Sequence, residues 1–216
     1  MKNLIESIIG KLGGTALVAV IKSIIEKFKP TRIAEQKAPR NFFEHFGPNV
    51  SKEFVKSKIG APHRQTGSIW SYHFSDALAQ FEFSENDSAR SVALALTYNS
   101  PASGFDLPLV GIPLGKLTLG HFVMERDGKL SYRSSSRTWE LLYQVQFPPH
   151  SATNYYTFGA LSLLTPFSLK ESSFNTEEAE RTPRVAAKGA LVNWVGISNT
   201  PEELWFDWSI AIPASA

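Results

Sequence analysis

The spacing of hydrophobic residues changes along this chain, and each change marks a different kind of predicted element. Residues 1–28 carry Ile, Leu, Val and Ala at helical spacing, with single charges between them. Residues 51–59 also have helical spacing, with Ser51 as the predicted N-cap and Gly60 as the residue that ends the helix. From residue 69 the period becomes two, which is typical of half-buried β-strands. The pattern therefore predicts an apolar N-terminal helix, a short second helix and then strands.

The N-terminal segment, residues 1–28, divides at its Gly13-Gly14 pair into two short amphipathic pieces. Its longest charge-free run, residues 12–21, has ten residues, whereas a transmembrane helix needs roughly 20. The segment therefore favours association with a membrane, as a tilted span or a surface helix, or docking onto a protein partner. An internal helix packed on its own domain is the third alternative. The residues that would face lipid or partner are Ile5, Ile8, Ile9 and Leu12 before the glycines and Leu17, Val20, Ile21, Ile24 and Phe28 after them.

Basic residues follow the apolar segment and give the chain an uneven charge. The net charge is +2, but residues 1–40 hold eight Lys or Arg against three Glu, so the remainder is net negative. Residues 29–40 are a predicted basic linker. Lys27 lies just before it and Lys29 begins it, and cations at this place attract anionic lipid. The positive-inside bias then predicts the cytoplasmic face of a bacterial inner membrane, with the cytoplasm as the alternative. Because the folded part is not basic, nucleic acid is not an expected partner.

The folded part, residues 41–216, is predicted to be an α+β binding domain. Alternating residues over 69–74, 77–84 and 91–98 predict an antiparallel meander behind the helix at 51–59. The predicted architecture is short helices packed on an antiparallel sheet.

A second copy of this helix-plus-meander unit is a further hypothesis. It would pair residues 49–98 with residues 116–165, because Trp70 lies 19 residues after Ser51 and Trp139 lies 21 after Thr118. Two last strands are expected within residues 189–213.

One stretch carries a resemblance to a known family. Within residues 49–97, a helix ends in Ile-Gly-x-Pro and is followed by Trp-x-Tyr and then by an alternating strand with Phe-x-Phe. This order resembles the small protein A/outer membrane lipoprotein A family, whose general fold the barrel-assembly lipoprotein and the β-lactamase inhibitor protein share. The resemblance implies a non-enzymatic binding or scaffold module. The chain departs from the lipoprotein members, because it has no cysteine to acylate.

Motifs for catalysis, cofactors and metals are weak or missing in the sequence. The lack of cysteine excludes a thiol nucleophile, a thiolate zinc site and disulfides. The run from Gly111 to Lys116 is one residue short of a P-loop. The five histidines have no metal-ligand spacing, and Glu177, Glu178 and Glu180 are typical of a charged loop. No enzyme, cofactor or metal is therefore predicted.

Aromatic residues are the remaining candidates for recognition, since aromatic side chains dominate binding hot spots. Most of them fall at alternating strand positions, which favours burial in the core. The best hypothesis is a non-enzymatic, membrane-associated binding or scaffold protein of bacterial type. A soluble inhibitor or immunity-like protein that docks through its N-terminal helix, and a membrane-permeabilising effector, are the alternatives. A homo-oligomer is compatible with each. The candidate recognition aromatics are Trp70, Tyr72, Trp139, Tyr155 and Tyr156, with Trp194, Trp205 and Trp208 in the same aromatic set.

Overall fold

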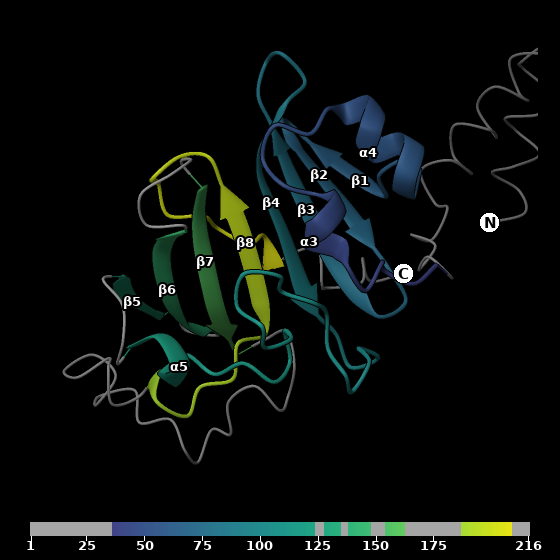
Figure 1. Ribbon diagram of the computed structural model, residues 1–216. Coiled ribbons are helices and arrows are strands. Elements are labelled where there is room, and N and C mark those ends of the chain that lie inside the picture. Colours follow the sequence, from purple (N-terminus) through teal and green to yellow (C-terminus); the bar gives the residue numbers. More distant parts are fainter. Residues whose placement is uncertain (1–35, 124–127, 135–137, 148–153, 163–186, 209–216) are drawn as a thin grey trace, which may run out of the picture. The chain divides into compact units, whose positions relative to one another are not determined.

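The computed structural model describes residues 36–123, 128–134, 138–147, 154–162 and 187–208 (Figure 1). Within these ranges eight strands form one antiparallel sheet, in the order β1-β2-β3-β4-β8-β7-β6-β5. The strands are β1 Arg64–Thr66, β2 Ile69–His73, β3 Ala77–Phe83, β4 Ala89–Leu96, β5 Lys129–Ser134, β6 Trp139–Phe147, β7 Asn154–Leu161 and β8 Trp194–Ser198. The helices are α3 Phe42–His45, α4 Lys52–Ile59 and α5 Gly120–Val123.

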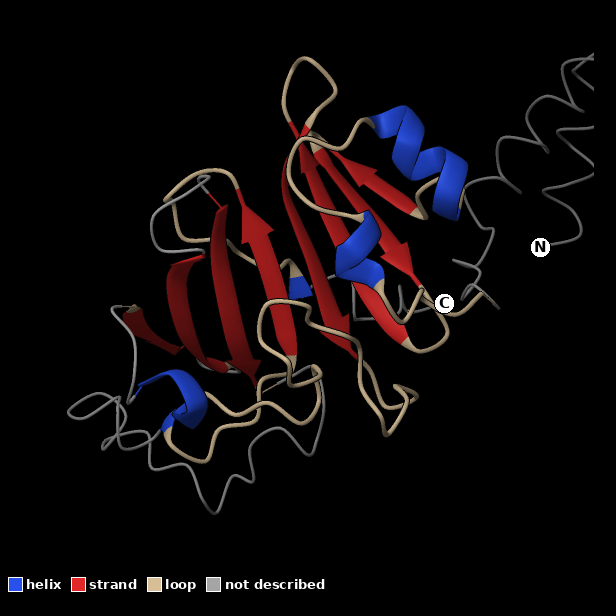
Figure 2. Ribbon diagram, in the orientation of Figure 1, coloured by secondary structure: helices blue, strands red, loops and turns tan. Residues whose placement is uncertain are grey.

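The predicted α+β class is wrong. The described part of the chain is mainly β, with one large sheet and three short helices, and Figure 2 shows how little helix stands beside the sheet. The physical reason is that loop residues between β4 and α5, among them Phe105, Leu114 and Leu117, are buried in the larger core where further helices were expected. The helix predicted for residues 1–28 lies outside the described residues.

The sheet consists of two meanders that meet at its centre. Strands β1 to β4 follow one another in the first half, and β5 to β8 do so in the second. The last strand of each half pairs with the other, so that Ala93 on β4 lies opposite Gly196 on β8. The meander predicted for residues 69–98 is confirmed by β2, β3 and β4. Whether the two halves are copies of one unit stays a hypothesis.

The helix predicted for residues 51–59 is confirmed as α4. The Ser51 side chain accepts a hydrogen bond from the Phe54 amide at 3.1 Å, and Gly60 ends the helix with φ +83°. Val55 and Ile59 are the buried residues of this helix. They join a larger core that also contains Phe42 of α3 and Phe122 of α5, so all three helices contribute to one face of the sheet.

The opposite face of the sheet has its own, smaller core, and we call it the second face. Successive strand residues alternate between the two: Leu141 and Tyr143 belong to the larger core, whereas Leu142 between them belongs to the smaller one. The buried members of the smaller core are Leu78, Ala93, Ala95, Leu142, Leu161, Trp194, Leu204 and Phe206.

A segment after β8, residues 202–208, covers part of the second face, and we call it the C-terminal segment. The strand predicted here is wrong for the described residues, because no strand pairing forms over 202–208. Leu204 and Phe206 are instead buried against the sheet, at 7% and 5% exposure. The segment therefore packs across the face of the sheet without pairing to any of its strands.

Trp194 lies at the centre of this packing and is fully buried. Its neighbours on the flanking strands are Ala95 on β4 and Gly159 on β7, both small. A Cβ atom on Gly159 would collide with the indole ring of Trp194. The Phe206 ring lies 5.8 Å from the Trp194 ring, between ring centroids. The large side chain therefore fits only because its neighbours are small.

The substitution Gly159→Ala should therefore destabilise the fold by about 1–3 kcal/mol, the usual cost of overpacking a core. Gly189→Ala is the matched control, since a Cβ there meets nothing within 4 Å, and it should change stability by no more than about 0.5 kcal/mol. Urea denaturation of both variants measures the difference. Equal losses of stability in the two variants would contradict this account of Trp194 packing.

Candidate functional site: the cleft on the second face

Two glutamine side chains hold the C-terminal segment against the sheet. Gln80 on β3 donates from Nε2 to the Trp205 carbonyl at 3.1 Å and accepts at Oε1 from the Asp207 amide at 2.8 Å. Gln144 on β6 donates to the Glu202 carbonyl at 3.1 Å. These side chains satisfy backbone groups that a strand would satisfy through its ladder. The segment is therefore fixed to both halves of the sheet.

Small residues lie between the two glutamines. Gln80 and Gln144 belong to one row across the sheet, and Ala93, Gly196 and Thr157 occupy the positions between them. Because these side chains are short, the segment's backbone can approach the sheet closely. A Cβ on Gly196 would lie 2.8 Å from the nearest methyl carbon of Leu204.

A cleft of about 730 Å³ opens beside the C-terminal segment. This volume is within the usual range for small-ligand sites. Apolar side chains and charged ones both line it, as is typical of such sites. The lining residues are Ile69, Gln80, Arg133, Thr138, Glu140, Leu161, Trp205, Phe206, Asp207 and Trp208.

Arg133 on β5 connects the edge of the sheet to the C-terminal segment. Its guanidinium donates to the Glu203 carboxylate at 2.5 Å, and its Cζ lies 3.2 Å from the ring centroid of Trp205. The two ion-pair side chains are only 22% and 20% exposed, so water screens them less than a surface pair. Stacking of a cation on an indole face adds attraction. Trp205 is itself 64% exposed, so an aromatic ring in contact with Arg133 faces solvent beside the cleft.

Glu140 on β6 lies across the ladder from Arg133 and lines the cleft. One of its carboxylate oxygens accepts a hydrogen bond from Trp194 Nε1 at 2.8 Å. Burial raises the pKa of Glu140 to about 7, although the Trp194 hydrogen bond and the Arg133 charge act to lower it. The nearby Glu203 charge raises it further. Near pH 7 the cleft therefore holds a carboxyl group that is partly protonated.

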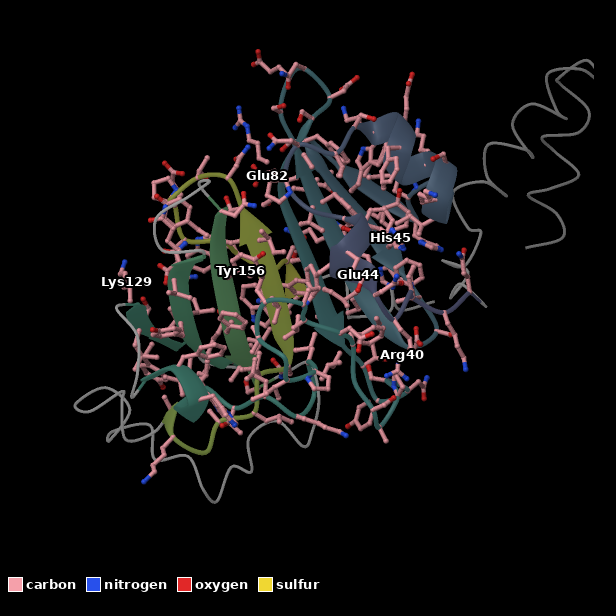
Figure 3. The ribbon with its side chains drawn as sticks, in the orientation of Figure 1. Arg40, Glu44, His45, Glu82, Lys129 and Tyr156 are labelled. Carbon is pink, nitrogen blue, oxygen red and sulfur yellow. The ribbon has the colours of Figure 1, made fainter. Side chains whose placement is uncertain are left out.

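A smaller pocket of about 330 Å³ lies on the other face of the sheet. Tyr156 on β7 and Glu44 on α3, both labelled in Figure 3, line it together with Phe158, Phe43 and residues 107–110. Burial raises the pKa of Tyr156. The wall of this smaller pocket is mostly apolar, and Leu109, one of its lining residues, is 49% exposed.

The five aromatic residues predicted for recognition are not brought together. Trp70 and Tyr72 are 4% and 0% exposed and pack in the larger core, so they do not form an exposed surface. Trp139 and Tyr156 pack against that same core, whereas Tyr155 alternates with Tyr156 and lies on the second face. The amines of Lys52 and Lys56 lie 5.6 and 5.1 Å from the Trp70 ring.

The charged cleft residues Arg133, Glu140 and Asp207 are not among the site residues that the sequence predicts. The signal that could have found Glu140 is that it is the one charged residue of β6, at the same parity as the buried Leu142. Trp205 and Trp208 were in the predicted aromatic set, but as members of a strand. The membrane-facing residues predicted within 1–28 lie outside the described residues.

The histidines of the described part of the chain show one close pair. The rings of His63 and His73 are 6.0 Å apart, and burial lowers the pKa of each. The His73 amide donates to Nδ1 of His63 at 3.1 Å, so this nitrogen is already in use. Over the residues described, no three His, Asp or Glu side chains gather as a metal site would require.

No described helix is both long enough and apolar enough to cross a membrane. No family model matches the chain, and no curated protein sequence matches it. Among solved structures, a DUF4309 family protein from Bacillus subtilis is similar, with 12% sequence identity and a TM-score of 0.39. The match covers 75% of this chain and 86% of that protein. This degree of likeness carries no argument about function.

Glu140 should make the fold less stable as the pH rises. Its pKa is about 7 when folded against a model value of 4.5, so between these values the folded state holds the extra proton. The free energy of unfolding contributed by this group is then highest below pH 4.5, falls as pH rises to 7 and levels off above it. Glu140→Gln keeps an acceptor for Trp194 and removes the titration.

The variant should therefore gain stability relative to the wild type between pH 5 and pH 8, by up to about 3 kcal/mol. Chemical denaturation at a series of pH values measures this difference. A difference between the two proteins that does not change with pH would show that Glu140 titrates as an ordinary carboxylate.

Proposed function

We propose that this chain is a non-enzymatic binding protein and that the cleft on the second face is its binding site. The observation that carries the proposal is the exposed Trp205 ring, stacked on Arg133 beside a cleft of about 730 Å³. A large exposed aromatic side chain that is held rigidly loses little entropy on binding, as is typical of hot spots. Trp208 and Phe206 add further aromatic surface to the same cleft.

The polar groups around the cleft support binding over catalysis. Both the nitrogen and the oxygen of the Gln80 side-chain amide form hydrogen bonds to the C-terminal segment. Arg133 is engaged by Glu203 and Trp205, and Glu140 is oriented by Trp194. Contacts of this kind fix the shape of a surface, which is what a preorganised binding site requires.

We further propose that residues 1–28 attach the protein to a membrane, with the domain on its cytoplasmic side. The support comes from the sequence, in which two apolar amphipathic pieces precede a basic linker at residues 29–40. A binding domain held at a membrane would act as a scaffold for its partner there.

Removal of residues 1–28 should release the protein from membranes. In cell fractionation with high-salt and carbonate washes, the full chain is expected in the pellet and the 29–216 truncation in the supernatant. Ile9→Asp places a charge on the predicted apolar face and should also release the protein. Ser7→Asp, on the opposite side of the same predicted helix, is the matched control and should leave it bound. Full-length protein that stays soluble would contradict membrane attachment and favour docking on a protein partner.

The cleft itself is tested by photocrosslinking in cells that produce the protein. A photoreactive phenylalanine analogue at position 205 should capture a defined partner. The same analogue at Tyr98, which is 71% exposed, is the control, and it should not capture that partner. Identical products from both positions, or none from position 205, would contradict a binding site at the cleft.

A further inference from the structure

We infer that the cleft takes an extended peptide segment of a partner protein, which pairs through backbone hydrogen bonds with one edge of the C-terminal segment. This inference rests on the proposed function and adds the kind of partner. It comes from the way in which the sheet holds the C-terminal segment, from the backbone groups that this contact leaves unpaired, and from the wall of the cleft beside them.

The C-terminal segment has the alternation of an extended chain. Leu204 and Phe206 are buried, whereas Trp205 between them is 64% exposed, and no helix or turn interrupts residues 203–207. In an extended chain, successive residues also direct their N–H and C=O groups to opposite edges. One edge therefore carries the backbone groups of residues 205 and 207, and the other carries those of residues 204 and 206.

Gln80 binds the first of these edges as a peptide group would. Its Nε2 donates to the Trp205 carbonyl at 3.1 Å, and its Oε1 accepts from the Asp207 amide at 2.8 Å. A side-chain amide offers the same donor and acceptor as a peptide bond. This contact therefore shows how a neighbouring backbone can pair with the segment.

The second edge has the same kinds of group without a partner, and we call it the open edge. In the described part of the chain, no group pairs with the Leu204 amide, the Leu204 carbonyl or the Phe206 amide. Both residues are buried, at 7% and 5% exposure, and backbone polar groups of buried residues are seldom left unpaired. An extended peptide along the open edge supplies the missing donor and acceptors, as in β-strand addition to a sheet edge.

The cleft gives such a peptide room and apolar contacts. Phe206, whose amide belongs to the open edge, lines the cleft together with Trp208, Ile69 on β2 and Leu161 on β7. These apolar side chains can receive alternate side chains of an extended peptide, which is the source of specificity in this mode of recognition. The volume of about 730 Å³ suits a short stretch of chain.

Arg133 favours a ligand that accepts hydrogen bonds. Its Nη1 is buried and has no hydrogen-bond partner among the described residues, and it belongs to the cleft wall. Because a guanidinium nitrogen only donates, the group that it lacks is an acceptor. A peptide carbonyl oxygen is a neutral acceptor, so the carboxyl groups of Glu140 and Asp207 in the same wall repel it less than they would repel an anion.

The first experiment follows amide hydrogen exchange by NMR in ¹⁵N-labelled full-length protein in a neutral detergent. The probe is an uncharged peptide of alternating pattern, Ac-Ser-Val-Thr-Phe-Thr-Val-Ser-amide. At saturation, exchange at Leu204 and Phe206 should slow by about tenfold or more, because both amides gain a hydrogen bond. The Trp205 amide between them faces the other edge and should not change. Equal slowing at all three amides, or no slowing at Leu204 and Phe206, would overturn the inference.

Two methylated peptides test the same pairing from the side of the ligand. One carries N-methyl groups on its two Val residues and the other on its two Thr residues, so each loses N–H groups from a different edge. Because an extended peptide pairs along one edge, one form should bind about tenfold more weakly than the parent peptide and the other within about threefold of it. Calorimetry measures the three affinities. Equal affinities of the two methylated forms would show that backbone pairing is absent.

Two variants place the peptide at the cleft. Trp205→Ala should weaken binding of the parent peptide, whereas Tyr98→Ala, another exposed aromatic, should leave it unchanged. Thermal unfolding checks that both variants keep the fold. Unchanged binding in Trp205→Ala would overturn the inference, because the peptide would then bind elsewhere.

The remaining outcomes separate this inference from the proposed function. If Trp205→Ala weakens binding but the two methylated peptides bind equally, the cleft is a binding site and backbone pairing is wrong. If the parent peptide does not bind, the inference is wrong, and photocrosslinking at position 205 still decides the proposed function.

Discussion

The burial of Trp194 is the constraint on which the second face depends. A fully buried indole at the centre of the sheet requires room on both sides, and Ala95 and Gly159 provide it. The buried Nε1 requires an acceptor, which is the carboxyl of Glu140. The ring would be exposed on the second face without a cover, and Phe206 of the C-terminal segment packs against it. One side chain thus links the sheet, the titratable group of the cleft and the segment that forms the cleft's wall.

The charges of the cleft are held in place by this arrangement. A buried carboxyl group costs free energy unless it is bonded or neutral, and Glu140 has one hydrogen bond and a pKa of about 7. Arg133 is shielded on one side by Trp205 and neutralised by Glu203, both from the C-terminal segment. Its Nη1 is buried without a hydrogen-bond partner among the described residues. The network is therefore preorganised but incompletely satisfied, as expected of a surface that receives a ligand.

Local features of the fold can be predicted from the sequence, whereas features that depend on contacts between distant residues cannot. Ser51 and Gly60 mark the ends of α4 through their own chemistry, and the alternation in β2 to β4 reports burial of one strand face. The C-terminal segment also alternates, with Leu204 and Phe206 buried, and so it was predicted as a strand. Its backbone bonds go to glutamine side chains, so period two arises from packing on a sheet face and not from a ladder. The fold class is mispredicted for a similar reason, because loop residues such as Phe105, Leu114 and Leu117 fill the larger core, and apolar spacing alone does not separate such loops from helices.

The cleft was beyond prediction for the same reason. Arg133 and Glu140 are brought together by cross-strand register, and Trp205 joins them from a segment 65 to 72 residues further along the chain. In the sequence alone, each of these three residues is indistinguishable from an ordinary surface or strand residue. Trp70 and Tyr72 show the opposite error. Their sequence pattern made them candidates for a recognition surface, but both side chains are buried in the larger core.

The most direct test of the cleft as the binding face uses the five tryptophans as reporters. Each indole N–H gives its own signal in a ¹⁵N–¹H spectrum, and substitutions to Phe assign them. When the partner captured by photocrosslinking at position 205 is added, we expect shifts for Trp205 and Trp208, with a smaller shift for Trp194 through its hydrogen bond to Glu140. The signal of Trp70, buried in the core of the other face, should not move. Shifts that are largest at Trp70, or the absence of any shift at Trp205, would contradict it.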